Sequence, residues 1–137
     1  MSQALYHSTL VEHAQAGRSR GRLTAPERSA TVDNPLCGDR VTIDLALADD
    51  RIAAVGHQVR GCLLCEAAAE IIADHAPGKT AAELAAAGAA ARAIVNEGAA
   101  APPGDWSALA VFAPVHEIKS RRDCVLLPFE ALAKALG

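Results

Sequence analysis

Four cysteines and one aspartate are the residues of this chain with the clearest chemical potential. Cys37 and Asp39 stand in the triplet Cys37-Gly38-Asp39, Cys62 and Cys65 form a Cys-x-x-Cys pair, and Cys124 lies near the C-terminal end. Thiolates are soft ligands for iron, zinc and sulfide, whereas a carboxylate is a harder donor. Three thiolates and one carboxylate could close a tetrahedral zinc site or hold an iron–sulfur unit.

Spacing alone leaves other interpretations open for these cysteines. A Cys-x-x-Cys pair without a second such pair is a weak zinc signal. The pair at 62 and 65 could also be redox-active, or the thiols could be inert residues of the core. The residues by themselves therefore indicate a metal or sulfur site without excluding these two alternatives.

Composition limits the classes of protein to which the chain can belong. Its 137 residues are enough for one domain, 1–137, with an independent core. A net charge of −3 argues against nucleic-acid binding, and no apolar run is long enough for a membrane span. The N-terminal residues lack an export signal, so we expect a cytoplasmic, reducing setting. Cysteines in such a setting are metal ligands or reactive thiols more often than disulfides.

The hydrophobic pattern predicts a mixture of helices and strands. A first helix over 3–16 should end at Gly17, and the arginine-rich stretch 17–28 should be a mobile, solvated connector. Alternating apolar residues predict strands over 29–34, 40–47 and 52–59, joined as a three-stranded antiparallel meander.

The second half of the chain should be helical. Helices are predicted over 62–75 and, after a Thr80/Glu83 capping box, over 80–97. A short helix over 105–112 should be interrupted by Pro114, and Asp123 should cap a last amphipathic helix. The predicted fold class is α+β: a small three-stranded antiparallel sheet with helices packed on one face.

These elements place the candidate ligands at their ends, where loops converge. Cys37 and Asp39 lie in the loop that enters the long strand, and Cys62 lies where the last strand turns into a helix. Cys124 begins the final helix. The dipoles of the two helices would favour the thiolate forms of Cys62 and Cys124.

Over most of its length the chain resembles the NifU/IscU-like family of iron–sulfur cluster assembly scaffolds. The matching positions occur in order: Tyr6 and His13, Gly21, Asn34-Pro35-x-Cys37-Gly38-Asp39, Gly61-Cys62, and Arg121 with Cys124. The resemblance implies a SufE/NifU-like fold and the ligand set Cys37, Asp39, Cys62 and Cys124. It also implies a scaffold or carrier that accepts sulfur from a cysteine desulfurase. Such a scaffold holds iron or a labile cluster and passes it to acceptor or carrier proteins.

Two departures from the housekeeping scaffolds favour the SufU branch. Asp123 stands where those scaffolds have a histidine before the late cysteine, and the stretch between Cys62 and Cys124 is longer. Members of the SufU branch bind zinc and take sulfur from a desulfurase, so a zinc-binding sulfurtransferase partner is the alternative function. By resemblance, the persulfide acceptor is Cys37 in that branch and Cys124 in the scaffold branch.

Three expectations concern the residues around this ligand set. Asp39, as the weakest ligand, favours transfer of the cargo over its retention. Cys65 is either a buried apolar residue or an auxiliary thiol, and Arg121 is either a solvated charge or a counter-charge to the thiolates. None of the five histidines is expected to be a ligand, and the oligomeric state stays open, because the first helix could dock on a neighbour.

Overall fold

The protein is represented by a computed structural model that describes residues 3–36 and 38–137. Cys37 lies outside the described residues. The described elements, in chain order, are α1 (Gln3–Arg20), β1 (Arg28–Asn34), β2 (Asp39–Ala48), β3 (Arg51–Arg60), α2 (Leu63–His75), α3 (Ala81–Glu97), the 3-10 helices η1 (Gly104–Glu117) and η2 (Lys119–Arg121), and α4 (Arg122–Leu136).

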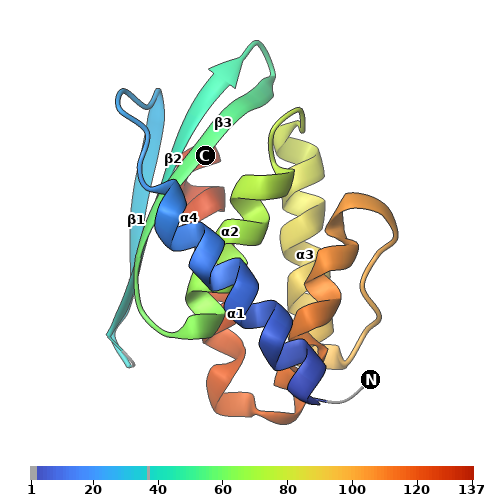
Figure 1. The fold of residues 1–137 in the computed structure, drawn as a ribbon. Helices are drawn as coiled ribbons and strands as arrows, with labels where there is room; N and C mark the ends of the chain where they lie inside the picture. The colour runs from blue at the N-terminus through green and yellow to red at the C-terminus, as the bar shows by residue number, and fades with distance from the viewer. Residues whose placement is uncertain (1–2, 37) are drawn as a thin grey trace.

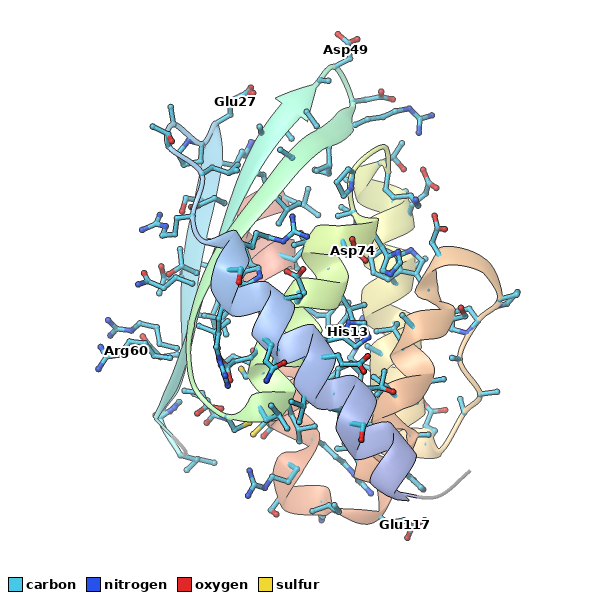
Figure 2. All side chains as sticks on the ribbon, viewed as in Figure 1. His13, Glu27, Asp49, Arg60, Asp74 and Glu117 are labelled. Carbon is cyan, nitrogen blue, oxygen red and sulfur yellow. The ribbon has the colours of Figure 1, made fainter. Side chains whose placement is uncertain are left out.

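The three strands form the predicted antiparallel sheet in the order β1-β2-β3. Alternate residues of β2 (Val41, Ile43 and Leu45) are fully buried on the face that carries the helices. Asp49, which has a positive φ of 57°, marks the tip of the β2–β3 turn (Figure 2). That turn and Asp39 lie at opposite ends of β2, because Asp39 is the first residue of the strand.

The helices cover one face of this sheet, as the sequence predicted (Figure 1). α2 and α4 pack directly on the strands, and α1, α3 and η1 pack on those two helices. Buried apolar residues from the sheet, α2, α3, η1 and α4 form one continuous core. Among the helices of the described residues, none combines the length and apolar character that crossing a bilayer requires.

The prediction that Gly17 ends the first helix is wrong. α1 continues through Gly17 to Arg20. A Cβ atom at Gly17 would lie 3.2 Å from both the Glu70 Cβ and the His57 Cε1. Gly17 therefore allows α1 to approach α2 and β3 closely, which outweighs the weak helix propensity of glycine.

The arginine-rich stretch is also not the solvated connector that we expected. Arg18 and Arg20 extend from the last turn of α1 to Glu66 and Glu70 of α2, each through two hydrogen bonds of 2.7–3.0 Å. Arg22 donates two hydrogen bonds of 2.9 Å to the buried Asp44 of β2. These bidentate pairs fix α1 and the following loop onto the sheet and α2.

Two predictions about the C-terminal elements need correction. Pro114 does not interrupt its segment, because η1 runs past it to Glu117. A proline removes only one donor from a series of tight 3-10 turns. α4 begins at Arg122, so Asp123 lies in its first turn and not at the N-cap. An acidic residue is still favourable there because of the helix dipole.

The predicted capping box at the start of α3 is present. Thr80 Oγ1 accepts a hydrogen bond from the Glu83 backbone N–H, and Glu83 Oε1 accepts one from the Thr80 N–H. We expect Thr80→Ala to lower the free energy of unfolding by about 1 kcal/mol. Chemical denaturation would measure this loss. Thr24→Ala, at an exposed position outside the helices, is the matched control, and an equal effect of both changes would contradict the role of the cap.

Candidate metal centre

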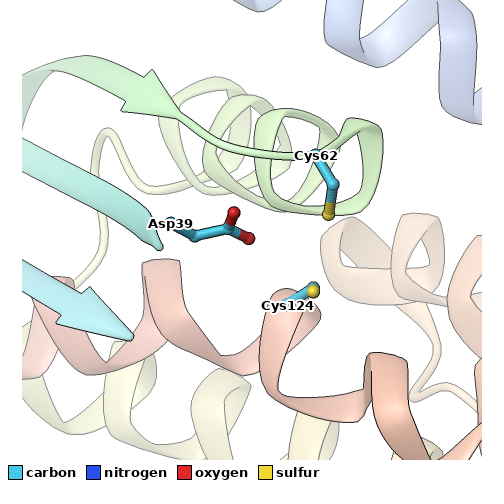
Figure 3. A group of neighbouring side chains, drawn as sticks. All are labelled: Asp39, Cys62 and Cys124. Atoms are coloured by element: carbon cyan, nitrogen blue, oxygen red, sulfur yellow. The ribbon is translucent and has the colours of Figure 1, made fainter. Parts of the chain in front are cut away.

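Three of the four predicted ligands converge at one end of the sheet. One carboxylate oxygen of Asp39 and the Sγ atoms of Cys62 and Cys124 all lie within 4.8 Å of one another. They come from the start of β2, the N-terminus of α2 and the first turn of α4 (Figure 3). Sulfurs that share a tetrahedral zinc ion lie about 3.8 Å apart, given Zn–S bonds of about 2.3 Å. The three donors are therefore spaced for one shared ion after small side-chain movements.

The strand pairing places Asp39 at this end of the sheet. Asp39 opposes Asn34 at the last pair of the β1–β2 register. Asn34 also holds the connection between the strands: its Oδ1 accepts from the Leu36 N–H at 3.0 Å, and its carbonyl accepts from the Gly38 N–H at 2.8 Å. Gly38 has a φ of +77°, a conformation that glycine adopts without strain. Hydrogen bonds from Leu36 and Gly38 to Asn34 thus hold the described residues on both sides of Cys37 in the connection that leads into Asp39.

The two cysteines are placed by the starts of two helices that pack on each other. Cys62 is the N-cap of α2, with extended φ and ψ, and its side chain makes no cap hydrogen bond. Cys124 is buried in the first turn of α4. The Cys62 side chain is therefore available to a ligand, and Figure 3 shows both thiols directed toward the space beside Asp39.

The environment of Asp39 fits a bound cation or cluster. Asp39 is 7% exposed, and its Oδ2 is buried with no hydrogen-bond partner among the described residues. An unpaired buried carboxylate oxygen is costly, so such an atom calls for a compensating ligand. Two thiolates and one carboxylate suit zinc or iron, whereas magnesium and calcium prefer an all-oxygen site.

The remaining predicted site residues lie in different surroundings. Cys37 is outside the described residues, although both of its neighbours belong to the turn held by Asn34. Cys65 is fully buried in the apolar core and does not belong to the converging group. Arg121, the N-cap of α4, is exposed.

Sequence reasoning singled out Arg121 but missed its neighbour Arg122. Arg122 Nη2 donates a 2.6 Å hydrogen bond to the His116 carbonyl. The His116 Nδ1 is in turn 3.1 Å from the Val95 carbonyl oxygen, and a Cβ atom at Gly98 would lie 3.1 Å from the His116 Cδ2. Arg122 thus connects the start of α4, two residues before Cys124, to the ends of η1 and α3. Adjacent arginines cannot be distinguished from a local pattern, because only the packing decides which one is inside.

Three carboxylates lie together at α4, the helix that carries the candidate ligand Cys124. Asp123 and Glu130, together with Asp33 of β1, line a hollow of about 200 Å³. Burial, and next the charge of Asp123, raise the pKa of Glu130 above its ordinary value. Asp123 lines this hollow and is absent from the donor group.

Fold and donor set agree with a family whose sequence model matches almost the whole chain. Residues 5–135 match the NifU-like N-terminal domain. The chain therefore belongs to the NifU-like N-terminal domain family, as the resemblance of its motifs predicted.

Particular relatives agree with this membership. The N-terminal part of a nitrogen-fixing NifU-like protein from Brucella abortus is 34% identical, with a TM-score of 0.86 over 93% of this chain and 89% of that chain. SufU from Fervidobacterium islandicum, a proposed scaffold of the SUF system, is 23% identical and has the same fold, with a TM-score of 0.87 over the whole of both chains.

Curated relatives match a shorter segment. An iron–sulfur cluster assembly scaffold protein IscU of Archaeoglobus fulgidus is 33% identical over 76 residues, which are 56% of this chain and 50% of that protein. An IscU of Streptococcus pyogenes is 25% identical over a segment of the same length. The chain thus spans about half the length of the curated relatives it matches.

Proposed function

We propose that residues 1–137 act as one NifU-type domain that assembles iron–sulfur clusters. In this proposal the domain accepts sulfur from a cysteine desulfurase, holds iron or a labile cluster, and passes the cluster to acceptor or carrier proteins in the cytoplasm. The observation that carries the proposal is the convergence of Asp39, Cys62 and Cys124 at one end of the sheet. Family membership and the scaffold names of the curated relatives support it.

The ligand roles follow from the donor chemistry. Cys62, Cys124 and Cys37 would supply thiolates, and Asp39 would supply the weaker oxygen donor. In sulfur acceptance, the Cys37 thiolate attacks the outer sulfur of the desulfurase persulfide. The S–S bond of the donor breaks, its cysteine leaves as a thiolate, and the persulfide passes to Cys37 without a change in total electron count. Cys124 is the alternative acceptor.

Anaerobic reconstitution with ferrous iron and sulfide would test the scaffold function. We expect visible absorption of a cluster, and activation of an apo acceptor protein that receives it. Iron-binding thiolates give this absorption only when they hold the cluster, so Cys37→Ala and Cys124→Ala should remove it. A cluster that forms equally well in both variants would refute the ligand assignment.

The second candidate function is that of a zinc-binding sulfurtransferase partner of a desulfurase. It is favoured because Asp123, and not a histidine, precedes Cys124 and lies outside the donor group. The fold is shared with the Fervidobacterium SufU over both whole chains. It includes the long segment with α3 and η1 that separates Cys62 from Cys124. Stoichiometric zinc in the purified protein, with stimulation of a desulfurase but no cluster transfer, would decide for this function.

Asp39 should control the release of the cargo. A carboxylate oxygen is a harder and more weakly held donor than a thiolate, so it can leave and open a position for the thiol of an acceptor. We therefore expect Asp39→Ala to retain the fold but to slow cluster transfer several-fold, as measured by activation of an apo acceptor. Asp33→Ala, which removes an exposed carboxylate from the neighbouring strand, is the control. Unchanged transfer in the Asp39 variant would contradict this role.

A further inference from the structure

Gly61, which joins β3 to α2, lies directly against the candidate ligand Asp39. A Cβ atom at Gly61 would be 2.8 Å from the Asp39 Cγ, 3.0 Å from its Oδ1 and 3.1 Å from its Cβ. Non-bonded carbon atoms attract one another only from about 3.5 Å outward, so this contact would be repulsive. We infer that Gly61 is a positioning residue for Asp39: its missing side chain lets the carboxylate lie in the metal centre. This inference rests on the proposed function.

The close approach, and not backbone freedom, explains the glycine at this position. The glycines with a positive φ are Gly21, Gly38, Gly78, Gly98 and Gly104. Gly61 is not one of them, so an alanine could adopt its backbone conformation. Gly61 is itself exposed. The three atoms that would lie nearest to the methyl group of an alanine all belong to the Asp39 side chain.

Asp39 could not yield to such a methyl group without leaving its position as a donor. The residue is fixed at the first position of β2 by its pairing with Asn34, and it is only 7% exposed. Its backbone therefore stays in place, and rotation of the carboxylate is the available response. Rotation would carry the donor oxygen away from the Sγ atoms of Cys62 and Cys124, which now lie within 4.8 Å.

The test uses Co²⁺, whose visible spectrum reports the number and type of its ligands. We expect Gly61→Ala to shift the Co²⁺ d–d bands from the wild-type pattern to that of Asp39→Ala, while the sulfur-to-cobalt charge-transfer band remains. Cluster transfer to an apo acceptor should slow by the same factor in both variants. Gly88→Ala is the matched control, because its new methyl group would lie no closer than 3.7 Å to a neighbouring side chain. That variant should keep the wild-type spectrum.

Double variants show whether Gly61 acts through Asp39. In Asp39→Ala the Cγ and Oδ1 are gone and only the Cβ, at 3.1 Å, remains near the new methyl group, so adding Gly61→Ala should leave the spectrum unchanged and lower the melting temperature much less than it does in the wild type. In Asp39→Asn the side chain keeps its shape, so Gly61→Ala should still shift the melting temperature of the metal-free protein downward. Together, the two double variants distinguish a steric clash with the Asp39 side chain from a backbone conformation that requires glycine.

Two results would overturn the inference. One is a wild-type Co²⁺ spectrum in Gly61→Ala when Asp39→Ala changes it. The other is an equal decrease in melting temperature when Gly61→Ala is added to the wild type and to Asp39→Ala. If Gly61→Ala alone does not fold but the double variant with Asp39→Ala does, the inference holds. Failure of the wild-type protein to bind Co²⁺ through its thiolates would instead refute the proposed function.

Discussion

Replacing Cys62 with alanine should weaken zinc or cobalt binding by roughly 100- to 1,000-fold. A structural zinc site binds with about 10–16 kcal/mol, which four ligands share, so one thiolate accounts for about 2.5–4 kcal/mol. Cys62 stands at the N-cap of α2 and makes no cap hydrogen bond through its side chain. Its removal should therefore affect the metal centre much more than the helix. Competition with a chromophoric chelator would measure the affinity.

Cys65 provides the matched control for this experiment. It lies one turn further along α2, but it is fully buried in the apolar core and outside the donor group. We expect Cys65→Ala to lower the melting temperature by a few degrees through lost packing and to leave the metal affinity unchanged. Equal losses of metal affinity in both variants would show that the ligand assignment on α2 is wrong. Such a result would also make Cys65 a ligand.

Replacing Glu70 with alanine should produce the largest loss of stability, about 3 kcal/mol. Glu70 of α2 is 5% exposed and accepts hydrogen bonds from Arg20 of α1, at 2.7 and 3.0 Å, and from the buried His57 of β3, at 3.1 Å. Without the carboxylate, the His57 ring is left buried without its acceptor and Arg20 loses its partner. Urea denaturation would measure the change.

Glu66 is the matched control for Glu70. It lies one turn earlier on α2 and likewise accepts two hydrogen bonds from one arginine, Arg18. The Arg18 side chain, however, is 58% exposed. Solvent screens such a pair, so Glu66→Ala should cost much less than Glu70→Ala. If the two variants lose equal stability, burial of the Glu70 network is not the source of its effect.

The same network should make stability depend on acidic pH. Burial raises the pKa of Glu70, but hydrogen bonds from His57 and Arg20 together outweigh it, so the pKa falls below its ordinary value of 4.5. The unfolded chain therefore takes up the proton first as the pH falls. The stability that Glu70 contributes is complete above about pH 4.5 and is lost as the pH falls through the folded pKa. The stability difference between wild type and Glu70→Ala should shrink over that interval.

The sequence by itself determined the elements of the fold and the residues that could act as donors. The alternation at Val41, Ile43 and Leu45 predicts β2, because a half-buried strand places every second side chain in the core. The Thr80/Glu83 pair predicts the start of α3, because the capping bonds are local. Cysteine chemistry and the order of the motifs indicated Cys62, Cys124 and Asp39 in the same way. The predictions of β2 and α3 depend on neighbours within a few residues, and the prediction of the donors depends on residue chemistry and on the order of the motifs along the chain.

Contacts between distant segments were decided by the tertiary structure alone. Gly17 would end an isolated helix, but here it allows α1 to approach Glu70 and His57. The arginines of the expected connector find their carboxylates 22 to 50 residues away along the chain. Gly61 lies against Asp39 for the same kind of reason. Burial and close approach depend on which surfaces meet when the whole chain packs, and a local pattern does not contain that information.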